Sequence, residues 1–278
     1  MVPRPGSRER PGSRARKRAK LALAHGSNEA VAAPPAVATP RDDERARRPE
    51  RYAFAACDAD HAETPRIAYE HLAPLLARLG ARLGKAPSEL RIYDPYYCAG
   101  SVVRHLRELG FSSVHNANED FYARARARDL PPFDVLVTNP PYTSDHVERL
   151  LAFCAAVAQP CCLLLPSYVY TKPYYASGPF GALRPLFLVP PCRYKYRSPP
   201  GASNAAGAVR KSGSGSSGQV TAPFPSFWYL KLPEAERETV DGWWRADTLL
   251  GARQGACAGC VLARSPDEVP HAMRDAAD

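Results

Sequence analysis

The stretch Phe133-Asp134-Val135-Leu136-Val137-Thr138-Asn139-Pro140-Pro141-Tyr142 decides the fold, because an apolar, β-branched strand stops abruptly at two prolines. Two consecutive prolines cannot extend a sheet, and they fix the backbone in a rigid, extended turn. Such a turn presents the Asn139 side-chain oxygen and the Pro140 carbonyl to the crevice at the carboxyl ends of the strands. In α/β sheets this crevice binds ligands, so the stretch predicts a functional site there.

Strand and helix patterns alternate on both sides of this stretch. Strands are expected at residues 90–93, 113–116, 133–138, 161–165, 186–189, 193–196 and 227–232, and helices at residues 66–79, 101–109, 121–128 and 145–157. The alternation predicts an α/β fold with a doubly wound, mostly parallel sheet. The strand at 227–232 closes this sheet.

Composition divides the chain into three parts, and the second part contains an insertion. Residues 1–50 mix Arg, Pro, Ser, Gly and Ala without periodicity, which predicts a disordered basic tail. The main domain is expected over residues 51–235, and residues 198–222 within it form a flexible Gly/Ser-rich insertion. Residues 236–278 form a C-terminal extension whose structure the sequence leaves uncertain.

The overall composition limits the classes of function. The chain has 278 residues with a net charge of +9, which favours a polyanionic partner, most simply nucleic acid. No apolar run reaches the ~18 residues that a membrane span needs, so contact with a membrane is not expected. The eight cysteines then indicate reduced intracellular thiols rather than a disulfide framework.

A compact basic run covers residues 14–20. It is interpreted either as a nuclear-import signal or nucleic-acid contact, or as a solvated tail or organelle transit segment. The protein is therefore expected inside the cell. The nucleus is slightly favoured, and the cytoplasm and an organelle stay open.

The turn after the strand has a specific chemical use. An aromatic amino group is a poor nucleophile because its lone pair is delocalised into the ring. Two acceptors, Asn139 and the Pro140 carbonyl, can grip its hydrogens and free that lone pair for attack on a methyl donor. Pro141 keeps the turn rigid, and Tyr142 can stack on the flat base and hold it in line.

The chain resembles the class I amino methyltransferases that use S-adenosylmethionine (SAM), whose signature is this Asn-Pro-Pro-aromatic tetrapeptide. In adenine-N6 enzymes with the cofactor region first, a Thr-Pro pair, an acidic loop with glycine, and an Asp-Phe pair precede the tetrapeptide. Thr64-Pro65, Asp94 to Gly100, Asp120-Phe121 and Asn139 to Tyr142 occur here in that order. The resemblance implies a Rossmann-like SAM-dependent methyltransferase sandwich, with SAM as the cofactor and an antiparallel closing strand.

By the same resemblance, one group of residues would bind SAM: Thr64, Pro65, Asp94, Cys98, Gly100, Asn118, Asp120, Phe121 and Asn139. Glu119 is a second candidate beside Asn118 for the ribose hydroxyls. Cys98 stands where the family carries its first glycine, and it fits this position if its φ is negative. The region between this loop and Asn139 is short, so one strand-helix unit of the family can be missing.

The acceptor is expected to be adenine N6 in RNA or DNA, with RNA favoured. The chain has no room for a dedicated target-recognition domain, which favours a looped RNA or a target delivered by a partner protein. The alternatives are guanine amino groups, a protein glutamine amide, and a non-catalytic binding module that retains the fold. Base or phosphate contacts are assigned to Tyr170 and Lys172, in a group with Tyr168, Tyr174 and Tyr175, and to Tyr194 and Tyr196.

No metal site is expected. Cys257 and Cys260 have the spacing of half a zinc site, and His271 is a conceivable third ligand. A tetrahedral site needs four ligands, and no second pair lies nearby. Cys161 and Cys162 are adjacent in a strand, so their side chains are expected on opposite faces of the sheet.

Overall fold

A computed structural model describes residues 52, 54, 62–197, 210–211, 219–222, 224–249 and 255–274. Contacts divide the chain into residues 1–44 and residues 45–278, and all described residues belong to the second unit. The predicted basic tail over residues 1–50, with its basic run, lies outside the described residues.

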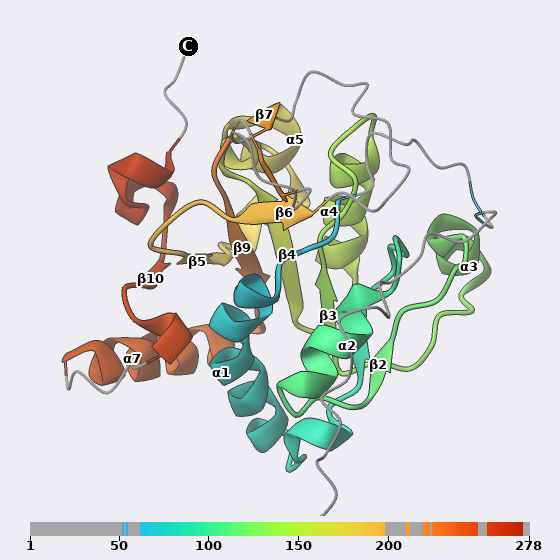
Figure 1. Cartoon of the computed structure of the whole chain (residues 1–278), viewed down its shortest axis with the longest axis horizontal. Helices are drawn as coiled ribbons and strands as arrows, with labels where there is room; N and C mark the ends of the chain where they lie inside the picture. The colour runs from blue at the N-terminus through green and yellow to red at the C-terminus, as the bar shows by residue number, and fades with distance from the viewer. Residues whose placement is uncertain are drawn as a thin grey trace, which may run out of the picture. The chain divides into compact units, whose positions relative to one another are not determined.

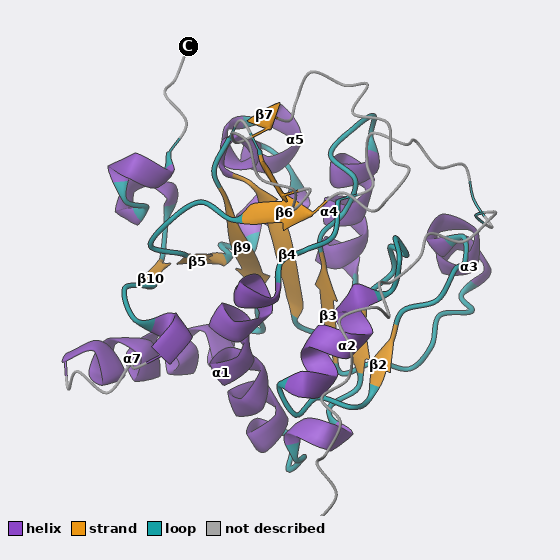
Figure 2. Ribbon diagram, viewed as in Figure 1, coloured by secondary structure: helices purple, strands orange, loops and turns teal. Residues whose placement is uncertain are grey.

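Each strand and helix expected from the sequence overlaps a strand or helix of the structure, with small differences at the ends (Figures 1 and 2). The helices are α1 (Arg66–Arg82), α2 (Ser101–Glu108), α3 (Phe121–Ala127), α4 (His146–Ala156), α5 (Pro173–Ala176), α6 (Pro179–Ala182) and α7 (Glu234–Leu249). The strands are β1 (Ile92–Tyr93), β2 (Val114–His115), β3 (Val135–Thr138), β4 (Cys161–Pro166), β5 (Leu186–Val189), β6 (Lys195–Arg197), β7 (Arg210–Lys211), β8 (Gln219–Thr221), β9 (Ser226–Lys231) and β10 (Val261–Ala263). Short 3-10 turns lie at Pro87–Glu89, Ser167–Thr171, Gly255–Cys257, Pro266–Glu268 and His271–Met273.

The main sheet has seven strands in the order β10-β5-β9-β4-β3-β1-β2. Strands β2, β1, β3 and β4 pair in parallel. Strand β9 lies antiparallel between β4 and β5, and β10 pairs antiparallel with β5 at the edge. The expected α/β class and the antiparallel closing strand are confirmed. The expectation of a mostly parallel sheet holds for the half formed by β2, β1, β3 and β4, whereas the pairs of the other half are antiparallel.

Apolar side chains on both faces of the sheet explain why its strands are apolar without alternation. One buried cluster joins Cys162 and Leu164 of β4 to α1, α2 and α7. The other joins Cys161, Leu163 and Leu165 of the same strand to α4, α5 and α6. The two adjacent cysteines therefore lie on opposite faces, as predicted, and helices cover both faces.

The predicted flexible insertion over residues 198–222 contains regular structure. Strand β8 pairs antiparallel with β6 and with β7, which makes a second, three-stranded sheet. Residues 210–211 and 219–221 of the predicted insertion pair their backbones in this sheet. Most of the other residues of the insertion lie outside the described residues.

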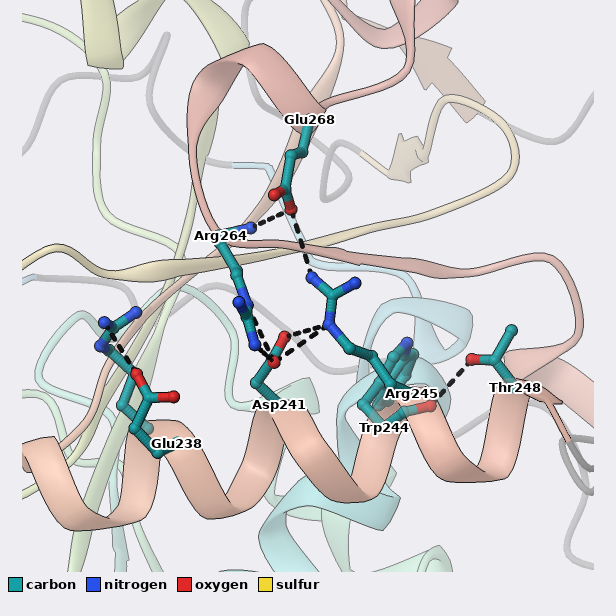
Figure 3. Close-up of polar contacts among 8 residues, drawn as sticks. Glu238, Asp241, Trp244, Arg245, Thr248, Arg264 and Glu268 are labelled. Carbon is teal, nitrogen blue, oxygen red and sulfur yellow. Dashed lines mark hydrogen bonds and ion pairs between the residues drawn. The ribbon is translucent and has the colours of Figure 1, made fainter.

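The C-terminal segment, which the sequence left unplaced, belongs to the domain. Helix α7 buries Val240 and Trp244 in the cluster of α1, and β10 completes the edge of the sheet. Arg264 and Arg245 both donate to the buried Asp241 carboxylate, at 2.9 and 3.0 Å from Nε to Oδ2 (Figure 3). The domain therefore extends beyond residue 235, and Asp241 ties α7 to the segment around β10.

Candidate functional site

The loop after β1 is fixed by a buried carboxylate. Asp94 Oδ1 accepts hydrogen bonds from Thr138 Oγ1 at 2.6 Å and from the Tyr96 backbone N–H at 3.2 Å. Asn116 Nδ2 donates to the backbone carbonyls of Asp94 and Tyr96 at 3.1 and 3.3 Å. Asp94 thus ties this loop to the last residue of β3, directly before Asn139.

Burial raises the pKa of Asp94 to about 7, although the hydrogen bonds from Thr138 and Tyr96 act in the opposite direction. The nearby Glu63 carboxylate raises the pKa further. With this pKa, the Asp94 carboxyl group changes its charge near neutral pH.

A second carboxylate holds the far end of the same loop. Glu63 accepts from the Ala99 backbone N–H at 2.7 Å and from the Ser101 hydroxyl. Burial also raises the pKa of Glu63, against the hydrogen bond from Ala99. The sequence interpretation gave Glu63 no role, although it directly precedes Thr64-Pro65, and this adjacency was the available signal.

The loop needs one left-handed residue, and that residue is a glycine. Gly100 has φ +79° and begins α2. Among the described residues other than glycine, positive φ occurs at Arg128, Ser144 and Arg184, so Cys98 has the negative φ that its position required. Cysteine at this position therefore causes no backbone strain.

A cavity of about 420 Å³ opens between this loop, α3 and the start of α4. Ligand sites for small molecules have volumes of about 300–1,000 Å³. The cavity is lined by Phe54, Ala62, Pro95, Tyr96, Tyr97, Cys98, Glu119, Asp120, Phe121, Tyr122, Arg126, Asn139, Pro141, Ser144, Asp145, His146 and Arg149.

The cavity gathers part of the predicted cofactor set. Of the predicted cofactor residues, Cys98, Asp120, Phe121 and Asn139 line it. Of the remaining predicted catalytic residues, Pro141 lines it, whereas Pro140 and Tyr142 do not. The other predicted cofactor residues, namely Thr64, Pro65, Asp94, Gly100 and Asn118, do not line it. Asp94 and Thr64 are buried, and Thr64 forms a hydrogen bond with the Tyr69 side chain.

Of the two candidates for contact with the ribose hydroxyls, Glu119 is the one that lies at the cavity. Glu119 lines the wall, whereas Asn118 does not. Hydrogen bonds from Arg124 and His115 lower the pKa of Glu119 and outweigh the effect of burial, which raises it. Glu119 therefore presents an ionised acceptor at the cavity wall, and Asn118, the other candidate for the ribose hydroxyls, does not line the wall.

Asp120 has two functions in the structure. Its Oδ1 accepts from the Ala123 backbone N–H at 2.9 Å and caps α3, while the residue also lines the cavity. Phe121 is buried, and its ring meets the ring of Tyr96 edge to face at 5.7 Å. This pair gives the cavity an apolar wall beside an acceptor.

Beyond Phe121 the wall consists of aromatic residues that the sequence interpretation missed. The hydroxyls of Tyr96 and Tyr122 lie 2.7 Å apart, and Tyr122 also donates to the His146 carbonyl at 3.2 Å. The Arg149 guanidinium lies 3.5 Å from the centroid of the Tyr122 ring. These side chains come from three segments far apart in sequence, so no local motif could indicate them.

Tyr142 does not line the cavity itself, but it contacts Asn139 at the cavity wall. The Tyr142 hydroxyl contacts Asn139 Oδ1 at 2.5 Å and the Leu164 carbonyl at 3.1 Å. Pro140 is buried, so the turn cannot move without disturbing the core. The rigid turn that the two prolines predicted is therefore anchored to β4.

Two of the predicted substrate contacts occupy the interior. Tyr196 is buried, and its hydroxyl forms hydrogen bonds with Ser226 Oγ at 2.5 Å and with the Tyr142 side chain. Tyr194 is buried too, and its hydroxyl lies 2.8 Å from His71 Nδ1. The prediction that these two rings stack on substrate is corrected: alternation along the strand turns them inward and leaves Lys195 exposed.

The other two predicted contacts, Tyr170 and Lys172, lie at the surface or near it. Tyr170 is half-buried and meets Phe187 at 6.3 Å. Lys172 is exposed, and its Nζ lies 5.2 Å from the centroid of the Tyr168 ring. Lys172 therefore borders an aromatic surface, and Tyr170 packs against the core.

The Cys257–Cys260 pair is buried and free of disulfides. The Cys257 thiol contacts the backbone carbonyls of Glu70 and His71 at 3.5 Å. Among the described residues, no three His, Cys, Asp or Glu side chains gather as a metal site would require. None of the described helices is long and apolar enough to cross a membrane.

Comparisons of the chain with protein-family models, with curated proteins and with solved structures found no match. The arguments below therefore depend on the residues and on their arrangement.

Proposed function

We propose that this chain is a SAM-dependent methyltransferase that transfers a methyl group to an exocyclic amino group of a nucleobase, with adenine N6 in RNA as the preferred acceptor. In this proposal the fold is the Rossmann-like methyltransferase sandwich. The observation that supports it best is the position of Asn139. This residue lies at the wall of the cavity, at the end of β3, and Tyr142 and the buried Pro140 hold it there.

The chemistry of the cavity wall fits SAM. Phe121 and Tyr96 give an apolar surface for an adenine ring, and Asp120 is an acceptor suited to its amino group. Glu119 is an acceptor suited to ribose hydroxyls, and the loop from Tyr97 to Cys98 passes along the same wall. When bound, SAM supplies an electrophilic methyl group.

The protein's own residues act on the acceptor nitrogen. Asn139 Oδ1 has two lone pairs, and the Tyr142 hydroxyl uses one of them. The second lone pair and the Pro140 carbonyl can accept the two hydrogens of an amino group. A preorganised pair of acceptors needs no rearrangement when the nitrogen develops positive charge during the transfer.

Calorimetric titration of SAM and S-adenosylhomocysteine tests the cofactor site. The matched variant is Asp120→Asn, because asparagine keeps the helix cap but replaces one carboxylate oxygen by an N–H donor. We expect binding to the wild type, and binding weakened by at least about ten-fold in Asp120→Asn. Absence of binding to the folded wild type would refute the proposal.

The acceptor is tested by transfer of radiolabelled methyl groups to separated RNA, DNA and protein fractions. Asn139→Ala should abolish transfer while the fold and most of the affinity for SAM persist. Substantial residual transfer by this variant would refute the assigned mechanism. Label in the protein fraction alone would favour a glutamine amide, and label in guanine would replace adenine as the acceptor.

A further inference from the structure

A row of partly exposed rings leads away from the acceptor end of the site. The ring of Tyr142 meets Phe224 at 5.8 Å, and Phe224 meets Tyr168 at 5.2 Å. All three side chains are partly exposed, and they come from the turn after β3, the segment before β9 and the turn after β4. The row therefore exists only in the folded domain.

The rings in this row do not stack on one another. Their planes cross at 64° and 88°, so the contacts are made edge to face. Parallel stacking covers one face of each ring in a pair, whereas an edge-to-face contact covers a face of only one of the two rings. Tyr142 and Tyr168 pack against the core with part of their surface, and the part that stays exposed can contact a flat partner.

The row ends at a cation. Lys172 is exposed, and its Nζ lies 5.2 Å from the centroid of the Tyr168 ring. Among the ion pairs of the described residues, none involves Lys172. Lys195, on the strand whose Tyr196 contacts Tyr142, is also exposed and in no such ion pair. The charge around the row is therefore available to an anionic partner.

We propose that the row formed by Tyr142, Phe224 and Tyr168 is a platform for an unpaired nucleic-acid strand, with Lys172 in contact with a backbone phosphate. Bases beside the acceptor base stack on Phe224 and Tyr168. This inference rests on the proposed function, because it takes Asn139 as the position of the acceptor base. Alternating rings and cations suit single-stranded nucleic acid, whose bases all have a flat face. A base pair inside a duplex keeps both faces covered by its neighbours, so the platform selects unpaired strands.

The test measures binding of short single-stranded RNA and DNA oligonucleotides to the full-length chain by fluorescence anisotropy. A 2-aminopurine base in the same oligonucleotides reports stacking through quenching of its fluorescence. Because every variant keeps residues 1–50, any contribution of that basic segment is the same in all of them. The variants are Tyr168→Ala and Lys172→Gln, and the matched controls are Tyr170→Ala, a ring of the same turn packed on Phe187, and Arg184→Gln, another exposed cation.

Tyr168→Ala should weaken oligonucleotide binding by about ten-fold and reduce the quenching of 2-aminopurine fluorescence, because one base stack is lost. Lys172→Gln should leave the quenching in place and reduce the slope of log K against log salt by about 0.7. The controls should behave as the wild type. Comparison of the RNA and DNA arms then shows whether the platform distinguishes the two sugars.

Four results would overturn the platform, and the first three concern the oligonucleotides. These are tighter binding of duplex than of single strands, quenching unaffected by Tyr168→Ala, and equal losses in Tyr168→Ala and Tyr170→Ala. A fourth is binding of glutamine-containing peptides in place of oligonucleotides. Titration of SAM into the same samples separates the two proposals: the platform fails alone if SAM binds while the oligonucleotide results are negative. The proposed methyl transfer fails alone if the oligonucleotide results are positive while SAM does not bind.

Discussion

Asp94 should make the stability of the domain fall as the pH rises from the acidic range towards neutrality. Its pKa is 3.8 in an ordinary environment and about 7 in the folded protein, mainly because of burial. Each pKa unit between the folded and unfolded states corresponds to about 1.4 kcal/mol. The full effect is therefore about 4 kcal/mol of unfolding free energy.

The sign follows from which state binds the proton. Below a pH of about 4 both states are protonated, and the contribution of Asp94 to stability is fully present. Between about pH 4 and about pH 7 the unfolded chain is ionised while folded Asp94 holds its proton, so stability declines as the pH rises. Above about pH 7 the contribution is lost, because the folded state then holds a buried charge.

The perturbation that isolates this effect is Asp94→Asn, which cannot ionise at this position. Urea denaturation at several pH values gives the unfolding free energies of the wild type and the variant. The difference between them should change by about 2–3 kcal/mol from about pH 5 to about pH 8, with the wild type losing stability relative to the variant. Parallel pH profiles would refute the reasoning, because a carboxyl group with an ordinary pKa contributes no slope in this range.

Two further changes test other parts of the structure. Tyr142→Phe keeps the ring but removes the hydroxyl that contacts Asn139, so kcat in methyl transfer should fall by about ten-fold with KM little changed; a change in KM alone would contradict this role. Asp241→Ala leaves Arg264 without its buried acceptor and should lower the unfolding free energy by about 1–3 kcal/mol, whereas Asp247→Ala on the same helix should have little effect. Because hydrogen bonds from Arg264 and Arg245 lower the pKa of Asp241 despite burial, its stabilising contribution should fade as the pH drops through the acidic range, the opposite direction to Asp94.

Much of the fold could be predicted because its signals are local. The apolar run of β3 ends at Asn139-Pro140 by the intrinsic geometry of proline, which no tertiary contact can alter. The opposite faces of Cys161 and Cys162 follow from the two-residue period of a strand. Residues 236–278 could not be placed in this way, because β10 is only three residues long and gains its partner, β5, from the folded sheet.

The candidate site also contains residues that the sequence indicated and residues whose position only the fold decided. The sequence singled out Cys98, Asp120, Phe121 and Asn139, and the folded chain places all four on one cavity. It assigned Tyr194 to the substrate because alternating charged and aromatic residues suggested a surface. The alternation itself was correct, but only the sheet decides which face is buried.

By itself, then, the sequence determined the alternation of strands and helices, the rigid turn at the end of β3, and the side-chain chemistry available there. The tertiary structure alone decided the partners: Glu63 with the loop before α2, Tyr122 with Arg149, and Phe224 with Tyr142. The physical reason is the separation along the chain over which each effect acts. Backbone geometry and strand period act between neighbours in the chain, whereas burial and hydrogen bonding join residues that only the packing of the sheet brings together.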